Sequence, residues 1–309
     1  MTSLLRKPAL GSALFFGIWS LMSLAMATPA HAISGIGISP PRIDISLLPG
    51  EKTSGQLTVI NDGDSAMGYT VYATDYSVSG ENYKGIFNNS GKGPNLSAIT
   101  WFGLPKGVQT LAGGKEATLD YTISVPKTAA IGGHYATVFV QTLPPTGSGT
   151  YIARIQRVGA IFYMGVGGNL KPQGHVVDLS VPWLQAVSPI TGYLRVQNTG
   201  NVHFLVSGSA QLYTLFGKVG TPTAILGEVL PSTTRRFPIS VSASSPIELY
   251  QMRLAVTFDG QTEHLSRWTL LVPTITLVIV CASLVLVVAA IVWAFVRRRR
   301  RKRSNPPQL

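Results

Sequence analysis

Short apolar runs separated by turn residues dominate the chain between residues 33 and 268. Runs of this kind, rich in Val, Ile, Thr, Tyr and Phe and bounded by Gly, Pro, Asn and Asp, predict β-strands. Strands are predicted at 55–60, 68–74, 117–125, 134–142, 152–166, 176–181, 192–197, 206–213, 236–241 and 251–258. Long amphipathic patterns with a helical period are hard to find between them. The spacing therefore predicts β-sandwiches rather than alternating strands and helices.

One stretch of this pattern occurs twice. Leu57-Thr-Val-Ile-Asn-Asp-Gly63 resembles Leu194-Arg-Val-Gln-Asn-Thr-Gly200, and each is a strand that ends in Asn-x-Gly. Asn and Gly tolerate the backbone conformations that tight turns require. The same features recur in the same order after each copy, because 121–125 resembles 237–241. The repeat predicts two domains of the same kind.

The two repeats differ in length, and the first carries extra residues. The Gly-rich segment 75–104 is the expected insertion, and residues 171–174 (Lys-Pro-Gln-Gly) are the expected linker. The prediction is an all-β exported part of two tandem immunoglobulin-like β-sandwich domains, 33–170 and 171–268, followed by one transmembrane α-helix.

The N-terminal segment has the three parts of a secretory signal peptide. Arg6 and Lys7 form a charged start, an apolar stretch follows, and Ala30-His-Ala32 is a small-x-small cleavage site. Cleavage is predicted after Ala32, so that residues 1–32 form the signal peptide. The alternative is an uncleaved membrane helix, since the apolar stretch is long for a signal peptide.

The C-terminal segment predicts a membrane anchor. Residues 270–296 carry no charge and are long enough to span a bilayer. Trp268 and Trp293 lie near the two ends, where indole rings favour the membrane interface. A basic stop-transfer cluster follows and begins the tail 297–309: Arg297, Arg298, Arg299, Arg300, Arg301, Lys302 and Arg303. Because positive residues stay in the cytoplasm, the domains are expected outside the cell membrane and the C-terminus inside.

The charge of the chain belongs mainly to its ends. The formal net charge is +12, but without the tail cluster and the two basic residues of the leader, acidic and basic residues nearly balance. This distribution argues against nucleic acid as a partner and favours membrane lipid at the tail. The single cysteine, Cys281, lies in the predicted span, so the exported part is expected to have no disulfide. Disulfide-free exported sandwiches favour a bacterial cell surface over an animal one.

The sequence contains no motif for catalysis, metal binding or cofactor binding. The histidines of the exported part do not have zinc-ligand spacing, and neither a Gly-x-Ser-x-Gly elbow nor a phosphate-binding loop is present. His134, beside Tyr135, has no partner that spacing can assign. No catalytic residue, metal or cofactor is predicted, and the protein is expected not to be an enzyme. A triad assembled from distant residues is the alternative that sequence alone leaves open.

Aromatic residues of the insertion are the candidate ligand-binding residues. Tyr76, Tyr83 and Phe87 lie among Asn and Gly, and rings beside amides suit stacking on sugars and hydrogen bonding to hydroxyl groups. The alternative is a hairpin pinned by its own aromatic side chains.

A set of motifs occurs in a fixed order along the first domain: Ile38-Ser-Pro-Pro41, Leu48-Pro-Gly50, Leu57–Asn61, Trp101, and Val125-Pro126 followed by Gly133-x-Tyr135. This order of motifs resembles the N-terminal domain of the WxL-interacting surface proteins of Gram-positive bacteria. The resemblance covers nearly the whole chain and implies peptidoglycan binding by the first domain and protein binding by the second. The same N-terminal pattern also resembles periplasmic pilus chaperones.

Two functions follow as hypotheses. The first is a non-enzymatic, membrane-anchored cell-surface protein that holds peptidoglycan and/or exported surface proteins near the membrane. The alternative is a chaperone-like assembly factor whose first domain lends a strand to exported subunits. Arg42, near the first strand, is the early basic residue that could receive a subunit's terminal carboxylate.

Overall fold

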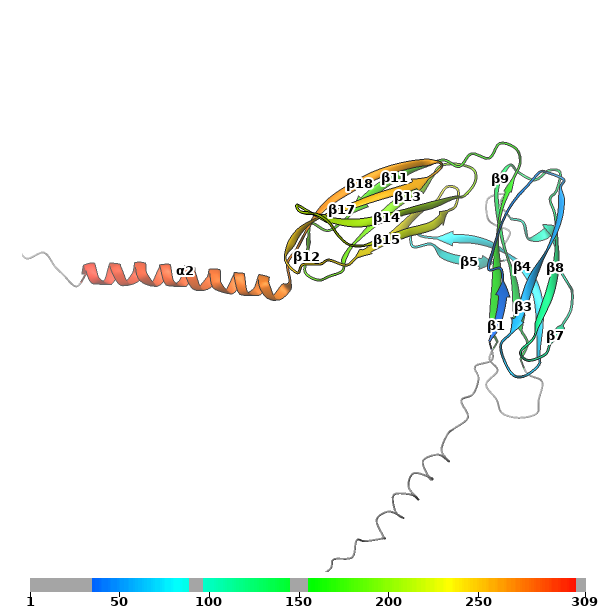
Figure 1. The fold of residues 1–309 in the computed structure, drawn as a ribbon, viewed down its shortest axis with the longest axis horizontal. Coiled ribbons are helices and arrows are strands. Elements are labelled where there is room, and N and C mark those ends of the chain that lie inside the picture. The colour runs from blue at the N-terminus through cyan, green and yellow to red at the C-terminus, as the bar shows by residue number, and fades with distance from the viewer. Residues whose placement is uncertain (1–34, 89–96, 145–154, 304–309) are drawn as a thin grey trace, which may run out of the picture.

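The computed structural model describes residues 35–88, 97–144 and 155–303, with side chains through residue 299. These residues form two β-sandwiches in a row, followed by one long helix (Figure 1). The predicted fold class, two tandem immunoglobulin-like sandwiches and a C-terminal apolar helix, is confirmed. The predicted signal peptide and its cleavage after Ala32 lie outside the described residues.

Two sheets form the first sandwich. One sheet has the order β1 (Ile36–Ser39), β3 (Lys52–Asn61), β8 (Glu116–Ser124) and β6 (Phe102–Gly103). The other has the order β2 (Arg42–Leu47), β10 (Arg157–Val166), β9 (Gly132–Thr142), β4 (Met67–Ser79) and β5 (Lys84–Asn88), with β7 (Gln109–Leu111) also paired to β4. A short 3-10 helix, η1 (Ile99–Trp101), precedes β6. The sheets enclose a core of alternate inward side chains such as Leu57, Ile123 and Phe162, all nearly inaccessible.

The first stretch of chain contributes to both sheets of this sandwich. β1 pairs with β3, and after Ser39-Pro40 and Pro41 the chain crosses to the other sheet, where β2 runs parallel to β10. Proline has no backbone N–H to donate, so the two prolines suit the point where the ladder is interrupted. The crossing closes one side of the sandwich. Sequence patterns predicted neither β1 nor β2.

The second sandwich repeats the plan with fewer strands in its smaller sheet. That sheet has the order β11 (Gly174–Ser180), β13 (Ile190–Asn198) and β16 (Thr234–Val241). The larger sheet has the order β12 (Leu184–Gln185), β18 (Gln261–Leu271), β17 (Glu248–Phe258), β14 (Phe204–Thr214) and β15 (Gly217–Val229). Its core, which includes Leu194, Ile239 and Met252, is separate from the first. The predicted boundary at residue 170 lies between the two cores.

Every predicted strand coincides with a strand of the structure, although residues 125, 155, 156 and 181, at the ends of three predictions, lie outside the strands. Residues 152–154 of one prediction lie outside the described residues. Apart from β1 and β2, the sequence did not predict β5, β6, β7, β12, β15 or β18. β15 and β18 are edge or near-edge strands with many polar or exposed positions, so their alternation is weak.

The repeated Asn-x-Gly segments have the same structure in both domains. Asn61 donates hydrogen bonds to the carbonyl oxygens of Ser65, Leu111 and Ala112 and accepts one from Gly63. Asn198 donates to Val202 and Val229 at 2.9 and 2.8 Å and accepts from Gly200 at 2.8 Å. Each buried side chain thus ties its turn to a neighbouring strand.

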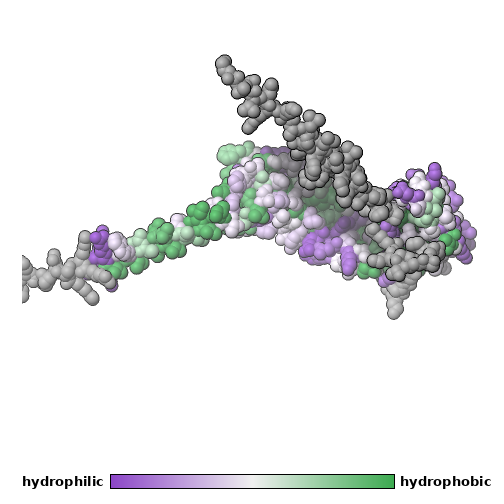
Figure 2. Space-filling model, turned by 90° about the horizontal axis from the view of Figure 1, so that it is seen from below, coloured by the Kyte–Doolittle hydropathy of each residue, from purple (hydrophilic) through white to green (hydrophobic). Residues whose placement is uncertain are grey.

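Helix α2 (Thr274–Arg303) follows the second sandwich directly. Within its described part, Thr274–Arg299 is long and apolar enough to cross a membrane, and none of its most apolar stretch is buried by the sandwiches (Figure 2). Leu270 and Leu271, predicted as the start of the span, instead complete β18, and Leu271 is buried in the core. Arg297 lies over the ring of Trp293 at 4.9 Å, where the basic cluster begins. The side chains of Arg300, Arg301, Lys302 and Arg303 lie outside the description.

Candidate functional site

The hairpin of β4 and β5 leaves the first sandwich and contacts the second (Figure 1). Tyr83, in its turn, has a positive φ of 57° and a hydroxyl that accepts the backbone N–H of Leu230 at 2.8 Å and bonds to the hydroxyl of Thr233. The guanidinium of Arg235 lies over its ring at 4.7 Å. Tyr83 is therefore an anchor between the two domains.

The polar residues beside Tyr83 contact the second domain too. The carboxylate of Glu81 accepts hydrogen bonds from Arg195, and these bonds lower the pKa of Glu81. Its backbone oxygen accepts the N–H of Arg236 at 2.8 Å, while the amide oxygen of Asn82 accepts the guanidinium of Arg236 at 2.6 Å. The tip bonds to β13 and β16 through backbone and side chains together, which fixes the angle between the domains.

A second contact between the domains is centred on Tyr135 of β9. Its hydroxyl accepts the backbone N–H of His203 at 3.1 Å and lies 3.2 Å from the ring nitrogen Nδ1. Nearby, the N–H of Gly133 donates to the carbonyl of Asn201 at 2.7 Å. The φ of Gly132 is 139°, and a Cβ there would lie 2.7 Å from the same carbonyl. Glycine is therefore required where the two backbones meet.

A charged cluster joins the two domains beside the hairpin tip and the Tyr135 contact. Arg42, at the start of β2, forms 2.6 Å ion pairs with Asp44 and with Glu228 of β15. Burial raises the pKa of Glu228, against the opposing effect of Arg42. Burial lowers the pKa of His203, whose Nε2 lies 3.6 Å from Asp44. We call the hairpin tip, the Tyr135 contact and this cluster the domain junction.

The junction changes what Arg42 can do. A terminal carboxylate of a partner would meet a guanidinium that already has two carboxylate partners, and the cluster as a whole carries no surplus positive charge. Arg42 is therefore a residue of the domain junction rather than a free anion site. Sequence patterns could not reveal this, because Glu228 lies in a strand that they did not predict.

The edge of the second sheet of the first domain is only partly covered. β2 pairs with residues 161–166 of β10, and no described strand pairs on that side with residues 157–160. The N–H of Ile161 donates toward Pro41 and the carbonyl of Gln156 accepts from Thr142 of β9. Since successive residues of a strand point their backbone groups to opposite sides, Arg157 and Gly159 point theirs away from β9. Residues 157–160 of β10 are hereafter the open edge.

Apolar and cationic side chains flank the open edge. Ile155, just before it, is 55% exposed. The guanidinium of Arg157 lies 4.3 Å from the centre of the Phe139 ring and donates a long hydrogen bond of 3.4 Å to the hydroxyl of Tyr72, and no ion pair of Arg157 is found among the described residues. An extended peptide here would find backbone partners, an apolar neighbour and one available cation.

The candidate ligand-binding residues of the sequence are separated by the fold. Tyr76 packs against the rings of Phe87 and Tyr163, at centroid distances of 5.5 and 6.0 Å. Phe87 also meets Phe139 edge to face at 5.2 Å. Tyr83 belongs to the domain junction. The pinned hairpin, the alternative in the sequence, describes these contacts, and ligand binding by Tyr76 and Phe87 stays a prediction.

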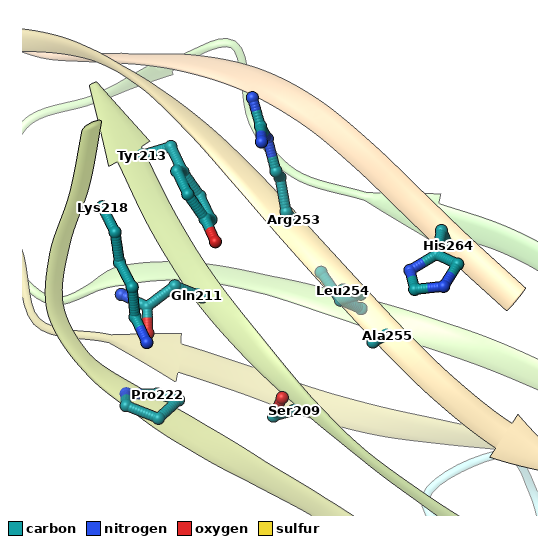
Figure 3. A pocket seen from close by; sticks show the side chains of 9 residues that line it. All are labelled: Ser209, Gln211, Tyr213, Lys218, Pro222, Arg253, Leu254, Ala255 and His264. Atoms are coloured by element: carbon teal, nitrogen blue, oxygen red, sulfur yellow. The ribbon is translucent and has the colours of Figure 1, made fainter. Parts of the chain in front are cut away.

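A shallow groove of about 400 Å³ lies on the outer face of the second domain (Figure 3). Its lining residues are Ser209, Gln211, Tyr213, Lys218, Pro222, Arg253, Leu254, Ala255 and His264. Arg253 lies 4.2 Å from the Tyr213 ring centre and donates to Gln251 at 2.7 Å. The lining includes cations and no carboxylate, so the groove is attractive to anions.

Among the described residues no group of His, Cys, Asp and Glu is arranged to hold a metal ion. His134 is buried, its Nε2 lies 2.9 Å from the carbonyl oxygen of Ala130, and its ring packs on Trp101 at 4.6 Å. These contacts make it a core residue of the first sandwich.

No family model and no curated protein matches the chain. Solved structures do match, among them the class 5 fimbriae chaperone CfaA (12% identity, 77% of this chain, 100% of that chain, TM-score 0.40). Others are the E. coli chaperone DraB (14%, 77% and 97%, TM-score 0.38) and the CsuC–CsuE chaperone–tip adhesion subunit pre-assembly complex of Acinetobacter baumannii pili (14%, 75% and 98%, TM-score 0.39).

These matches correct the first functional hypothesis. The prediction of a surface protein that holds peptidoglycan is wrong, because the structures of like architecture named above are chaperones and a chaperone complex of surface fibres. The contacts of Tyr83 give a physical reason, since its ring and hydroxyl are already occupied by the second domain. The resemblance to WxL-interacting proteins stays a prediction.

Proposed function

We propose that this protein is a chaperone-like assembly factor that holds an extended segment of an exported polypeptide as an added strand on the open edge. The observation that supports this function is the unpaired side of residues 157–160 of β10, beside the end of β2. The segment would continue the line of β2 and exchange backbone hydrogen bonds with Arg157 and Gly159. An added strand gains its affinity from the main chain and its specificity from alternate side chains.

The two faces of the open edge suggest which segments would bind. Val158 and Ala160 point toward the core of the sandwich, where Ala160 is buried and Val158 packs against its margin. Apolar residues at alternate positions of the segment would extend that core. Arg157 lies on the other face and would favour an acidic side chain or a terminal carboxylate.

The rigid domain junction supports this role. A donor strand must stay extended and correctly placed while a partner pairs with it, and preorganisation of this kind reduces the entropic cost of binding. The hairpin tip and Tyr135 hold the second domain against the same sheet that carries the open edge. Helix α2 would cross the cell membrane with its basic end in the cytoplasm, so that both domains work on exported chains at the outer surface.

The test uses the full-length protein in lipid nanodiscs and a client of stated chemistry, an immunoglobulin-like subunit of a surface fibre from which the last strand has been deleted. We expect the wild-type protein to suppress aggregation of the client, measured by light scattering. We also expect the client to slow hydrogen exchange at the N–H groups of Arg157 and Gly159, which face the open side.

Two variants at one position provide the matched control. R157P removes one backbone donor on the open side, whereas R157A removes the same side chain and keeps the donor. We expect R157P to lose most of the suppression of client aggregation and most of the slowing of hydrogen exchange at Gly159. We expect R157A to keep most of both. Equal activity of the two variants would contradict binding by strand addition, as would a wild-type protein that leaves aggregation and exchange unchanged.

A further inference from the structure

The end of the second sandwich next to α2 differs in chemistry from the rest of the exported part. Three segments meet there: 181–189, 243–248 and 268–273. The N–H of Leu270 donates to the carbonyl of Trp183 and that of Val272 to Gln185, while Glu248 is opposite Leu271. Glu248 is the one charged residue in these three segments. Such a composition is unusual for a surface in water.

A hairpin tip reaches the same end. Strand β14 pairs with β17 so that Tyr213 is opposite Gln251, and Gln251 is opposite Trp268 of β18. Continuing this register by three residues brings the tip of the β14–β15 hairpin level with Leu271, the last residue of β18. The tip consists of Leu215 and Phe216.

Large apolar side chains at this end are exposed. Phe216 is 94% and Leu215 is 79% exposed, and neither packs on the second core. Val187, Trp183 and Ile247, from two other segments, are 68%, 63% and 53% exposed. We call these five residues the apolar rim. Exposed apolar clusters of this kind mark interaction surfaces.

Cations lie just behind the apolar rim. Lys218 is opposite Tyr213 on β15, and Arg253 lies over the ring of Tyr213 in the groove of Figure 3. Both are about three to five residues from the level of the tip, or roughly 10–15 Å along the strands. When the tips reach the interface, these basic residues lie just above the headgroup layer, at a distance from anionic lipid of about one Debye length (about 8–10 Å).

The chain itself determines what lies against the apolar rim. Helix α2 begins at Thr274, and Val272 and Pro273 alone separate it from β18. Where the helix enters a bilayer, the rim must therefore lie within the headgroup layer, which is about 5–8 Å deep on each side of the hydrocarbon. No stalk is present that could hold the second domain away from it.

We propose that the apolar rim is a lipid-binding surface that seats the second domain on the bilayer, with Phe216 and Leu215 inserted at the interface and Lys218 and Arg253 facing anionic headgroups. The proposal rests on membrane crossing by α2, as in the proposed function. Binding of the apolar rim to lipid would fix the tilt of both domains relative to the membrane, because the domain junction joins them rigidly. The open edge would then be directed away from lipid.

The test uses three full-length proteins with a single cysteine each, labelled with the fluorophore NBD in nanodiscs that contain phosphatidylglycerol and a phosphatidylcholine spin-labelled near the headgroup. The first keeps the native Cys281 inside α2. The second is C281S with F216C, and the third is C281S with Q261C. Gln261 is the matched control, because it is exposed at the start of β18, beside the β17–β18 turn at the opposite end of the same sheet.

We expect the label at position 216 to be quenched several-fold more than the label at position 261, with a blue-shifted emission. Equal, weak quenching at 216 and 261 would overturn the lipid seat. Labelled Cys281 reports the anchor separately: a label shielded from water-soluble quenchers shows a spanning helix, and an accessible one refutes anchoring and the seat together. Client binding by the open edge is measured independently, so its failure is distinguishable from either result.

The role of charge is tested with K218E in the same F216C protein. A lipid seat predicts weaker quenching at 216 in this variant and a smaller difference between nanodiscs with and without phosphatidylglycerol. Quenching that is identical with and without anionic lipid in both proteins would remove the electrostatic part of the proposal.

Discussion

The β4–β5 hairpin of the first domain and the β14–β15 hairpin of the second occupy the same place in the repeated plan, but their tips have opposite chemistry. Each follows the strand after an Asn-x-Gly turn. The first tip carries Glu81, Asn82 and Tyr83, and all three bond to the second domain. The second tip carries Leu215 and Phe216, which are almost fully exposed.

This difference shows how the same hairpin in two similar domains can serve two different kinds of contact. The turn of a hairpin contributes little to the core of its own sandwich. Its side chains can therefore vary to suit a neighbouring domain or another surface that the turn contacts. Polar groups with fixed partners join one domain to the next, whereas apolar groups without partners suit lipid. With the proposed lipid-binding surface, the two tips together would form a chain of contacts that runs from the first domain through the second to the membrane.

The largest effect is expected where the two domains are most alike. Changing Asn198 or Asn61 to Ala should lower the free energy of unfolding of its own domain by about 3 kcal/mol, because each change leaves buried carbonyl groups without a donor. Calorimetry of the purified protein should show one transition displaced in each variant. If one of the two changes is silent, the two turns are not equivalent in stability.

The next effect separates the two hairpin tips. Changing Tyr83 to Ala should weaken the domain junction by about 2 kcal/mol, through loss of the Leu230 and Thr233 hydrogen bonds and the Arg235 contact. Small-angle scattering should show a broader distribution of interdomain distances. The matched change of Phe216 to Ala should leave this distribution unaltered, and a similar broadening in both variants would contradict the distinction between the tips.

A smaller effect distinguishes Tyr135 of β9 from Tyr250 of β17, which lie in the strands that follow the similar segments 121–125 and 237–241. The hydroxyl of Tyr250 bonds to both backbone groups of Ser245 within its own domain, whereas that of Tyr135 reaches His203 in the other domain. Changing Tyr250 to Phe should cost about 1 kcal/mol of stability in the second domain. The same change at Tyr135 should mainly loosen the junction. Calorimetry and scattering on both variants separate these outcomes, and a reversal would show that the assignments are wrong.

The smallest effect is a dependence of the junction on pH. Burial lowers the pKa of His203, so the closed junction favours the neutral ring. As the pH falls below the ordinary value of 6.5, an opened junction takes up a proton that the closed one does not, and stability is lost until the lowered pKa is passed. Burial raises the pKa of Glu228, whose protonation favours the closed state at acidic pH.

Comparison with H203Q isolates the histidine contribution. The wild-type junction should lose stability relative to the variant as the pH falls through the window below about 6.5, and the difference should be constant above that window. Scattering at several pH values measures it. A difference that stays constant through the window would mean that His203 does not titrate with opening.

Several elements were predictable because local patterns determine them. The ten predicted strands have inward apolar positions at a period of two, and the Asn-x-Gly turns follow from the conformations open to asparagine and glycine. The start of α2 differs from the predicted span because Leu270 and Leu271 are apolar for another reason. Leu271 is buried in the core of the second sandwich, and Leu270 precedes it at the end of β18, where it is partly buried. Hydropathy alone does not distinguish a buried strand from the start of a membrane helix.

The sequence by itself determined that the chain has two sandwich domains and an apolar C-terminal helix, since periodicity and length are local properties. Only the tertiary structure decided that Arg42 meets Glu228, that Tyr83 joins the domains, and that residues 157–160 of β10 have no described partner on one side. These features depend on strand order and on the angle between domains. Both arise from pairing between residues far apart in the chain, which no local pattern records.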